Sequence, residues 1–392
     1  MEKLSEQGKL RPWMGLLLFT VVMALFLFAF TPLQLSLGIP GLIITELGFL
    51  VLAVVYCMVR KIKLTEMFPI KKVKVREVIG AVIMVLGMFP ISIMLVAITS
   101  IIFPAATSEI DELSSFIYDS LGFPAAVLIV ALMPAVCEEA IHRGAILSHF
   151  RGIKHDWVIV LIMGLFFGIN HMSVLRFLTT MTLGLFLTYV VVKKNNLLLS
   201  MIMHFTNNLI SVVLSYAFDQ GSTGSASANY TAVLGTYLIL GFLSPVLITL
   251  GLMLIYPEGH KKIKFLWAGI LSVVMLVTGL GINISASAHN TLLNSMISYK
   301  ITERDQEDSS LYFDVEEERT ATVVVMITNA EGDYTVRIDG DSGSNIINAE
   351  IPEGTVRMVT YNVDLQPDHY TVTVIAGDNA IGENPQIQVT VQ

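Results

Sequence analysis

The chain is dominated by apolar stretches of about 17–25 residues, the length that a helix needs to cross a membrane core of about 30 Å. We find nine of them, at residues 13–30, 40–59, 78–103, 122–148, 157–174, 177–192, 197–217, 232–256 and 265–283. Composition agrees, because 54% of the residues are hydrophobic and only 14% are charged, whereas soluble proteins are about 25% charged. The sequence therefore predicts a polytopic α-helical membrane protein with about nine transmembrane helices, and it excludes a soluble multidomain enzyme.

Basic residues concentrate in alternate connectors between these stretches. The basic segments are the N-terminus (Lys3, Lys9 and Arg11), Arg60–Arg76, Arg151–Lys154, Lys193–Lys194 and Lys261–Lys264; the other connectors are Thr31–Gly38, Glu109–Asp119 and Asp219–Ala228, with Arg176 as the basic exception. Since Lys and Arg favour the cytoplasmic side, we expect a multi-pass cell-membrane protein with a cytoplasmic N-terminus and an extracytoplasmic C-terminus. Because the basic residues form short runs rather than one face, the lipid bilayer is an expected partner and nucleic acid is not.

The C-terminal part of the chain differs in both charge and periodicity. From Lys300 onward there are 5 Lys and Arg against 18 Asp and Glu, a net charge of −13, whereas residues 1–299 carry 19 against 14, or +5. Alternation of β-branched and polar residues predicts strands at Ala321–Asn329, Tyr334–Ile338, Thr355–Asp364, Tyr370–Ala376 and Gln386–Val391. We predict an extracytoplasmic all-β, immunoglobulin-like sandwich of roughly 80 residues, preceded by a solvated acidic linker at Glu303–Glu318.

These patterns suggest four segments. Residues 1–119 hold N-terminal transmembrane helices and a basic cytoplasmic connector, 120–217 hold the core helices with polar residues, 218–299 hold the C-terminal transmembrane helices, and 300–392 hold the β-domain.

Strongly polar residues occur at membrane depth in only a few places. They are Glu138, Glu139, His142 and Arg143 in the fourth stretch, Asn170 and His171 at the end of the fifth, His204, Asn207 and Asn208 in the seventh, and Glu46 in the second. Charged groups in hydrocarbon cost at least about 2.5–3.5 kcal/mol each, so the cluster requires an explanation. Helical spacing stacks Glu139 on Arg143 as a structural ion pair, which leaves Glu138 on a separate face. We expect Glu46 to reach an interface or to bond a neighbouring helix.

A buried glutamate with two histidines and an asparagine suits two kinds of amide hydrolysis. In one, Glu138 takes a proton from water, His171 holds that water, and His204 and Asn208 donate hydrogen bonds to the developing oxyanion. In the other, His171, His204 and Glu138 bind zinc or another divalent metal, which activates the water. The residue types do not choose between the two mechanisms.

The ordered motifs Glu138-Glu139-x-x-x-Arg143, Phe167-x-x-x-His171 and His204-x-x-x-Asn208 resemble the CPBP family, also called Abi, over residues 120–217. That family comprises type II CAAX prenyl endopeptidases and bacterial bacteriocin-processing or immunity proteins. The resemblance implies an intramembrane protease core with Glu138 as the base. It also implies catalytic or metal-binding roles for His171 and His204, a polar partner in Asn208, and motif support from Glu139, Arg143 and Phe167. His142 is a departure, since the family often has an aromatic residue there.

The expected function is therefore an intramembrane endopeptidase acting on a membrane-associated protein or peptide. A non-proteolytic binding protein, such as a bacteriocin immunity factor that keeps the motifs for fold and partner recognition, is the main alternative. A proton-coupled transporter is disfavoured, because no internal repeat is visible and the polar residues form one compact cluster.

Overall fold

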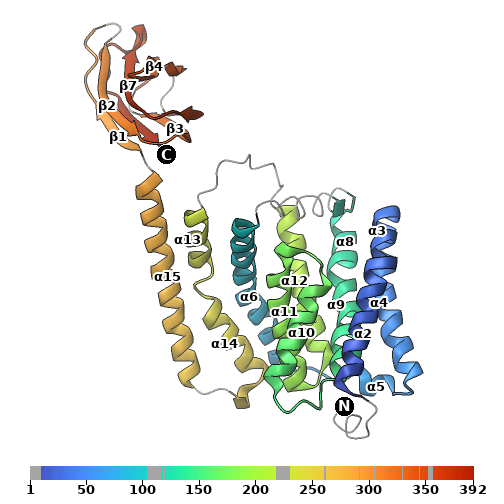
Figure 1. Ribbon diagram of the computed structural model, residues 1–392. Helices are drawn as coiled ribbons and strands as arrows, with labels where there is room; N and C mark the ends of the chain where they lie inside the picture. The colour runs from blue at the N-terminus through green and yellow to red at the C-terminus, as the bar shows by residue number, and fades with distance from the viewer. Residues whose placement is uncertain are drawn as a thin grey trace. The chain divides into compact units, whose positions relative to one another are not determined.

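The computed structural model describes residues 10–103, 116–117, 120–217, 230–259, 262–290, 292–303, 306–328, 330–343, 345–351 and 356–392. The chain divides into two compact units (Figure 1): a helical unit of Met1–Ser222 and Val233–Gly281, and a unit of Thr223–Ala232 and Ile282–Gln392 that holds the strands. Several expectations fall outside the described residues. They concern Lys3, Lys9, Lys261, the connector at 219–228, and the connector at 109–119 except for residues 116 and 117.

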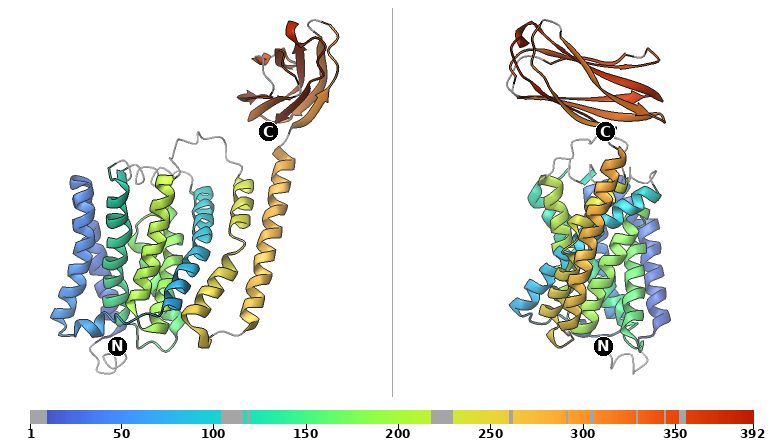
Figure 2. Two further views of the ribbon diagram at one scale, coloured as in Figure 1. Left: turned by 180° about the vertical axis from the view of Figure 1, so that it is seen from behind. Right: turned by 90° about the vertical axis from the view of Figure 1, so that its left-hand side faces the viewer.

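Apolar helices make up the helical unit, as they must if the backbone is to satisfy its own hydrogen bonds in lipid. Their bounds are α2 Pro12–Leu25, η1 Phe26–Phe30, α3 Thr31–Leu37, α4 Ile39–Val59, α5 Leu64–Met67, α6 Val75–Ile102, α8 Phe123–Ala126, η3 Val127–Leu132, α9 Met133–Glu139, η4 Ala140–Ile146, α10 Asp156–Asn170, α11 Val174–Lys194, α12 Leu197–Ala217, α13 Tyr230–Leu240, α14 Ser244–Ile255, η5 Pro257–Gly259 and α15 Lys262–Asn290. Helix α11 packs against α6, α10 and α12 (Figure 2).

In the described part of the chain, eight helical segments are long and apolar enough to cross a membrane. They are Pro12–Leu37, Ile39–Val59, Val75–Ser100, Phe123–Ile146, Val174–Lys194, Leu197–Ala217, Val233–Ile255 and Ile263–Ser285. The stretch predicted at 157–174 corresponds to α10, which has 15 residues and is therefore about 22 Å long. The predicted count of nine is thus not confirmed, because α10 ends at Asn170 instead of continuing to residue 174.

The tight turn after α10 explains its early end. Met172 has a left-handed backbone with φ of 45°, and Ser173 caps α11 by accepting a hydrogen bond from the backbone N–H of Arg176. The two helices then pack closely, since a Cβ placed on Gly184 of α11 would lie 2.9 Å from Cβ of Phe167 on α10. Glycine at 184 therefore lets the motif phenylalanine approach the backbone of α11.

The segment Phe123–Ile146 is a single helical rod in which two π-helical turns flank α9. The second of these turns, η4, begins directly after Glu139 and contains His142 and Arg143. Such π turns widen the helix locally and often occur at functional sites.

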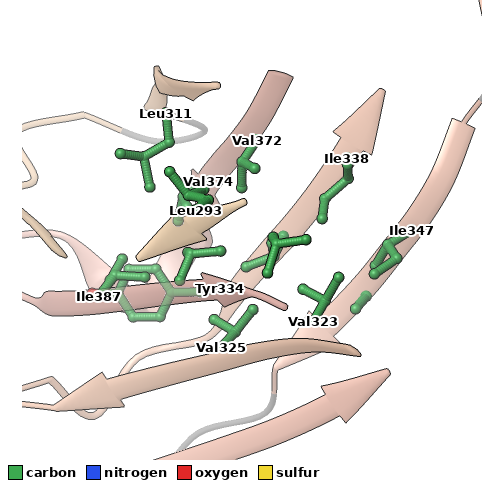
Figure 3. Close-up of a cluster of buried hydrophobic side chains, with 14 of the residues drawn as sticks. Leu293, Leu311, Val323, Val325, Tyr334, Ile338, Ile347, Val372, Val374 and Ile387 are labelled. Atoms are coloured by element: carbon green, nitrogen blue, oxygen red, sulfur yellow. The ribbon is translucent and has the colours of Figure 1, made fainter. Parts of the chain in front are cut away.

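The other unit contains two four-stranded antiparallel sheets, with strand orders β1-β8-β3-β6 and β2-β7-β4-β5. The strands are β1 Leu293–Ser298, β2 Glu307–Val315, β3 Arg319–Thr328, β4 Tyr334–Gly340, β5 Asn345–Ile351, β6 Val356–Leu365, β7 Asp368–Ala376 and β8 Gln386–Val391. Alternate residues are buried along β4, along β8 and along β3 from Ala321 onward, as the period of two requires. Figure 3 shows Val323 and Val325 from one sheet gathered with Val372 and Val374 from the other in a shared apolar core.

The β-sandwich is therefore present, but two expectations about it change. The immunoglobulin-like fold is not confirmed, although Tyr370 Oη donates to the carbonyl of Gln366 at 3.0 Å and accepts from its N–H at 3.1 Å, which fixes the turn before β7. The acidic linker predicted at 303–318 is wrong, because β2 occupies most of it. Leu311, Phe313 and Val315 are buried in β2 between polar residues, and the density of acidic side chains hid this alternation. The pattern also missed β1 and β5.

Candidate active site

The four residues predicted as catalytic line one cavity of about 490 Å³ inside the helical unit. Glu138 comes from α9, His171 from the turn after α10, and His204 and Asn208 from α12. Contacts of α12 with α9 and α11, and of α10 with α11, bring these elements together. The cavity unites residues from three separate sequence motifs.

Glu138 contributes a carboxylate to the lining of this cavity. Its residue is 8% exposed, and among the described residues its Oε2 atom has no hydrogen-bond partner. Its backbone carbonyl accepts a hydrogen bond from Nδ1 of His142 at 3.0 Å. The ionisable groups around the Glu138 side chain include His204, Arg143, Glu139, Arg176 and Glu46. Glu138 thus lines the cavity and has one carboxylate oxygen without a partner among the described residues.

Glu139 is held in a separate network behind the cavity wall. Its Oε1 accepts from Nη1 of Arg143 at 2.7 Å and lies 3.2 Å from Nδ1 of His204. Arg143 also donates to the carbonyl of Gly184 at 3.4 Å. Glu139 and Arg143 are fully buried and do not line the cavity, so their ion pair orients His204 from α12.

Phe167 lies between the charged and the imidazole groups. Cζ of Arg143 is 4.1 Å from its ring centroid, a cation–π distance. The rings of His171, His142 and His204 meet it edge-on, with centroids 4.9, 5.3 and 5.6 Å away. Phe167 therefore packs against the rings of all three histidines and restricts their orientation.

Each of the two cavity histidines uses Nδ1 to bond the protein. Nδ1 of His171 lies 2.8 Å from the carbonyl oxygen of Phe167, to which it donates, so Nε2 carries the free lone pair in the neutral ring. Nδ1 of His204 is similarly directed at Glu139. Among the described residues, Nε2 of neither ring forms a hydrogen bond, so this atom is left for a bound molecule.

Asn208 is oriented by two hydrogen bonds. Its Nδ2 donates to the carbonyl of Val130 in η3 at 3.2 Å, and its Oδ1 accepts from Nδ2 of Asn207 at 3.2 Å. An amide nitrogen carries two N–H groups. Among the described residues, the second N–H of Asn208 forms no hydrogen bond, and Asn208 lines the cavity.

The residues do not fit the predicted metal site in this arrangement. Among the described residues, no group of three or more His, Cys, Asp and Glu side chains is placed to hold a metal ion. Glu138, His171 and His204 share a cavity without converging on one point of coordination, and we derive no step through a metal.

Other polar residues also line the cavity, and three of them had no predicted role in the site. They are Asn170, which is buried with an unpartnered Oδ1 among the described residues, Arg176 at the start of α11, and Glu46 of α4. Arg176 had a sequence signal, as the basic residue in a connector where cations are not expected. His142, in contrast, does not line the cavity and is fully buried, which indicates a supporting position.

Each comparison with known proteins covers only part of the chain. Residues 120–210 match the family model described as Rce1-like, type II CAAX prenyl endopeptidase Rce1-like. No curated protein matches the chain.

Two solved structures are similar to part of the chain. One is the carbohydrate-binding module of Cellvibrio mixtus lichenase 5A in complex with cellotriose, with 15% identity over 26% of this chain and 92% of that chain and a TM-score of 0.18. The other is the structure of infectious bursal disease virus Gx strain, with 8% identity over 26% of this chain and 30% of that chain and a TM-score of 0.19. Neither likeness bears on function at these TM-scores.

Proposed function

We propose that the Rce1-like domain at residues 120–210 is the catalytic core of a membrane endopeptidase that acts on a membrane-associated protein or peptide. The observation that carries this proposal is the cavity in which Glu138, two histidines and an asparagine meet among apolar helices. Such a cavity excludes bulk water while supplying a base and hydrogen-bond donors, which is what hydrolysis of an amide requires.

Glu138 acts as the general base. Its unpartnered carboxylate oxygen takes a proton from a water molecule, and Nε2 of His171 accepts that water's second hydrogen bond. The water oxygen then bonds to the carbonyl carbon of the scissile peptide. This division of work agrees with the geometry, since Glu139, the neighbouring carboxylate, is already bonded to Arg143.

The oxyanion formed by this attack needs donors. The free N–H of Asn208 and, when its ring carries both protons, Nε2 of His204 supply them. As the carbon–nitrogen bond breaks, the proton held by Glu138 passes to the amine nitrogen. The products are a carboxylic acid and an amine, and Glu138 returns to its starting state.

The proposed placement in the membrane follows from the basic connectors. The N-terminus and the segments around Arg60, Arg151 and Lys193 face the cytoplasm, and the β unit is extracytoplasmic. Protease digestion of intact cells should release a tag at the C-terminus and spare one at the N-terminus. The opposite pattern would reverse the orientation.

The test of function compares peptide termini in membranes and medium of host cells carrying the native protein or Glu138→Ala at equal abundance. Termini that appear only with the native protein would establish proteolysis and identify the substrate. Gly269→Ala is the matched control, because a Cβ at Gly269 meets no atom within 4 Å, and it should give the native termini. Identical termini with the native protein and Glu138→Ala would contradict the proposal and favour the non-proteolytic binding protein.

A further inference from the structure

Glu46 is a buried carboxyl that the proposed mechanism does not use. It lies in α4, outside residues 120–210, and is 4% exposed in a helix that is otherwise apolar. Its Oε2 atom has no hydrogen-bond partner in the described parts of the chain. Buried polar groups in proteins are nearly always bonded, so a carboxyl with an unpartnered oxygen inside a membrane helix requires an explanation.

An ion pair does not explain Glu46. The charged side chain in electrostatic range of it, among those described, is Glu138, which has the same sign. Helix α4 packs against α9 and η4, and this packing brings the two carboxyls to one cavity. Glu46 is therefore held beside the proposed base without a cation of its own.

Glu46 belongs to a polar wall formed with Gln34 and Thr45, both of which line the same cavity. Within this wall, Nε2 of Gln34 donates to Oγ1 of Thr45 at 2.8 Å, and Oγ1 of Thr45 donates to the carbonyl of Gly41 at 2.9 Å. Gln34 and Thr45 thus bond each other and the backbone, whereas Glu46 lines the cavity with one oxygen that has no partner among the described residues.

A substrate bound in a membrane cavity needs hydrogen-bond partners for its backbone, and these residues can supply one. Its scissile peptide must leave the helix to expose the carbonyl carbon, and unwinding removes the hydrogen bonds of neighbouring N–H and C=O groups where no bulk water replaces them. A carboxylate accepts an N–H, and a protonated carboxyl also donates to a C=O. In an extended strand, one residue presents both groups to the same side.

We propose that Glu46 hydrogen-bonds the unwound backbone of the substrate beside the bond that Glu138 cleaves. Glu46 is then a positioning residue, contributed by a helix outside the Rce1-like domain, and it selects substrates whose cleavage segment becomes extended. This inference rests on the proposed endopeptidase function and concerns how the same cavity holds its substrate.

The experiment uses full-length protein in proteoliposomes and a synthetic peptide spanning the cleavage site found by comparing termini. Glu46→Met keeps a similar side-chain length but removes both polar atoms. It should raise KM by about tenfold or more, with a much smaller change in kcat. Glu46→Gln keeps one acceptor and a donor group, so its KM should lie between those of the native protein and Glu46→Met. Cys57→Ala, a buried change on the same helix that does not line the cavity, is the control for altered packing of α4.

Thermal unfolding in detergent separates this role from a structural one. Because Glu46→Met removes an unpartnered buried carboxyl, its Tm should rise by a few degrees while substrate binding weakens. A lower Tm for Glu46→Met would mean that Glu46 stabilises the fold, and it would overturn the inference. If the KM of Glu46→Met is unchanged while Glu138→Ala loses cleavage, the inference about Glu46 is overturned and the proposed function is retained. Identical termini with the native protein and Glu138→Ala would instead remove the proposed function and the inference together.

Discussion

Nη1 of Arg143 lies 2.7 Å from Oε1 of Glu139, one helical turn earlier, and both side chains are fully buried. The same oxygen lies 3.2 Å from Nδ1 of His204. Glu139 is therefore committed to a network that joins η4 to α12, whereas the adjacent Glu138 lines the cavity. Two neighbouring glutamates thus receive different environments and, in the proposed mechanism, different tasks.

Arg143→Leu should destabilise the helical unit by about 3–5 kcal/mol, since it leaves a buried carboxylate without its cation. The double variant Glu139→Met with Arg143→Leu should regain most of that loss, because neither charge is then stranded. Thermal unfolding in detergent measures the stability of the single and the double variant. A double variant as unstable as Arg143→Leu alone would mean that the ion pair is not what Arg143 contributes.

Asn208→Ala should lower kcat by about 10²–10³, the usual cost of removing one oxyanion donor. Ser215→Ala is the matched control on the same helix. Ser215 also lines the cavity, but its hydroxyl is bonded to the carbonyl of Ser211, so this variant should cleave at the native rate. Single-turnover cleavage of the identified substrate separates the two, and equal rates would remove Asn208 from the mechanism.

Gly184→Ala should reduce both cleavage and stability, the latter by about 1–3 kcal/mol, the typical cost of overpacking. A Cβ there would lie 2.9 Å from Cβ of Phe167 and 3.1 Å from Cα of Gly164. The shift would move the ring against which His171 and His204 are set. Gly269→Ala, which meets no atom within 4 Å, should change neither; similar losses in both variants would point to a general effect of alanine.

Acid should weaken the β unit through Glu383. Partial burial acts to raise the pKa of Glu383, but hydrogen bonds from Tyr334 Oη and from the N–H groups of Glu331 and Gly332 outweigh it and lower the pKa below its ordinary value. A depressed carboxyl pKa gives stability that is present above the unfolded value of about 4.3. That stability is lost as pH falls through the lower folded value.

Glu383→Gln should therefore cost about 2 kcal/mol at neutral pH and remove this part of the acid sensitivity. Amide hydrogen exchange of β4 in the full-length protein, followed from neutral pH down to about pH 3, measures both the loss of stability at neutral pH and the sensitivity to acid. An unchanged acid response in Glu383→Gln would assign that sensitivity to other carboxyls.

Features that depend on one element at a time were predictable from the sequence. The ion pair of Glu139 and Arg143 follows from i, i+4 spacing, and the observed contact agrees with it. The strands β3, β4, β6, β7 and β8 follow from alternation and overlap the predicted ranges in the described residues. The strand β2 was missed because acidic side chains on its exposed positions made it resemble a linker.

Features that depend on which elements become neighbours required the tertiary structure. Apolar length determined that the chain is a membrane protein, and period-two alternation determined that a β unit follows, because these signals are carried by residues close together in the sequence. Only packing decided that α10 ends after 15 residues at a tight turn, and that α4 presents Glu46 to the cavity of Glu138. A uniformly apolar helix does not encode which neighbour each face meets, so sequence periodicity could not place Glu46 beside a residue 92 positions away.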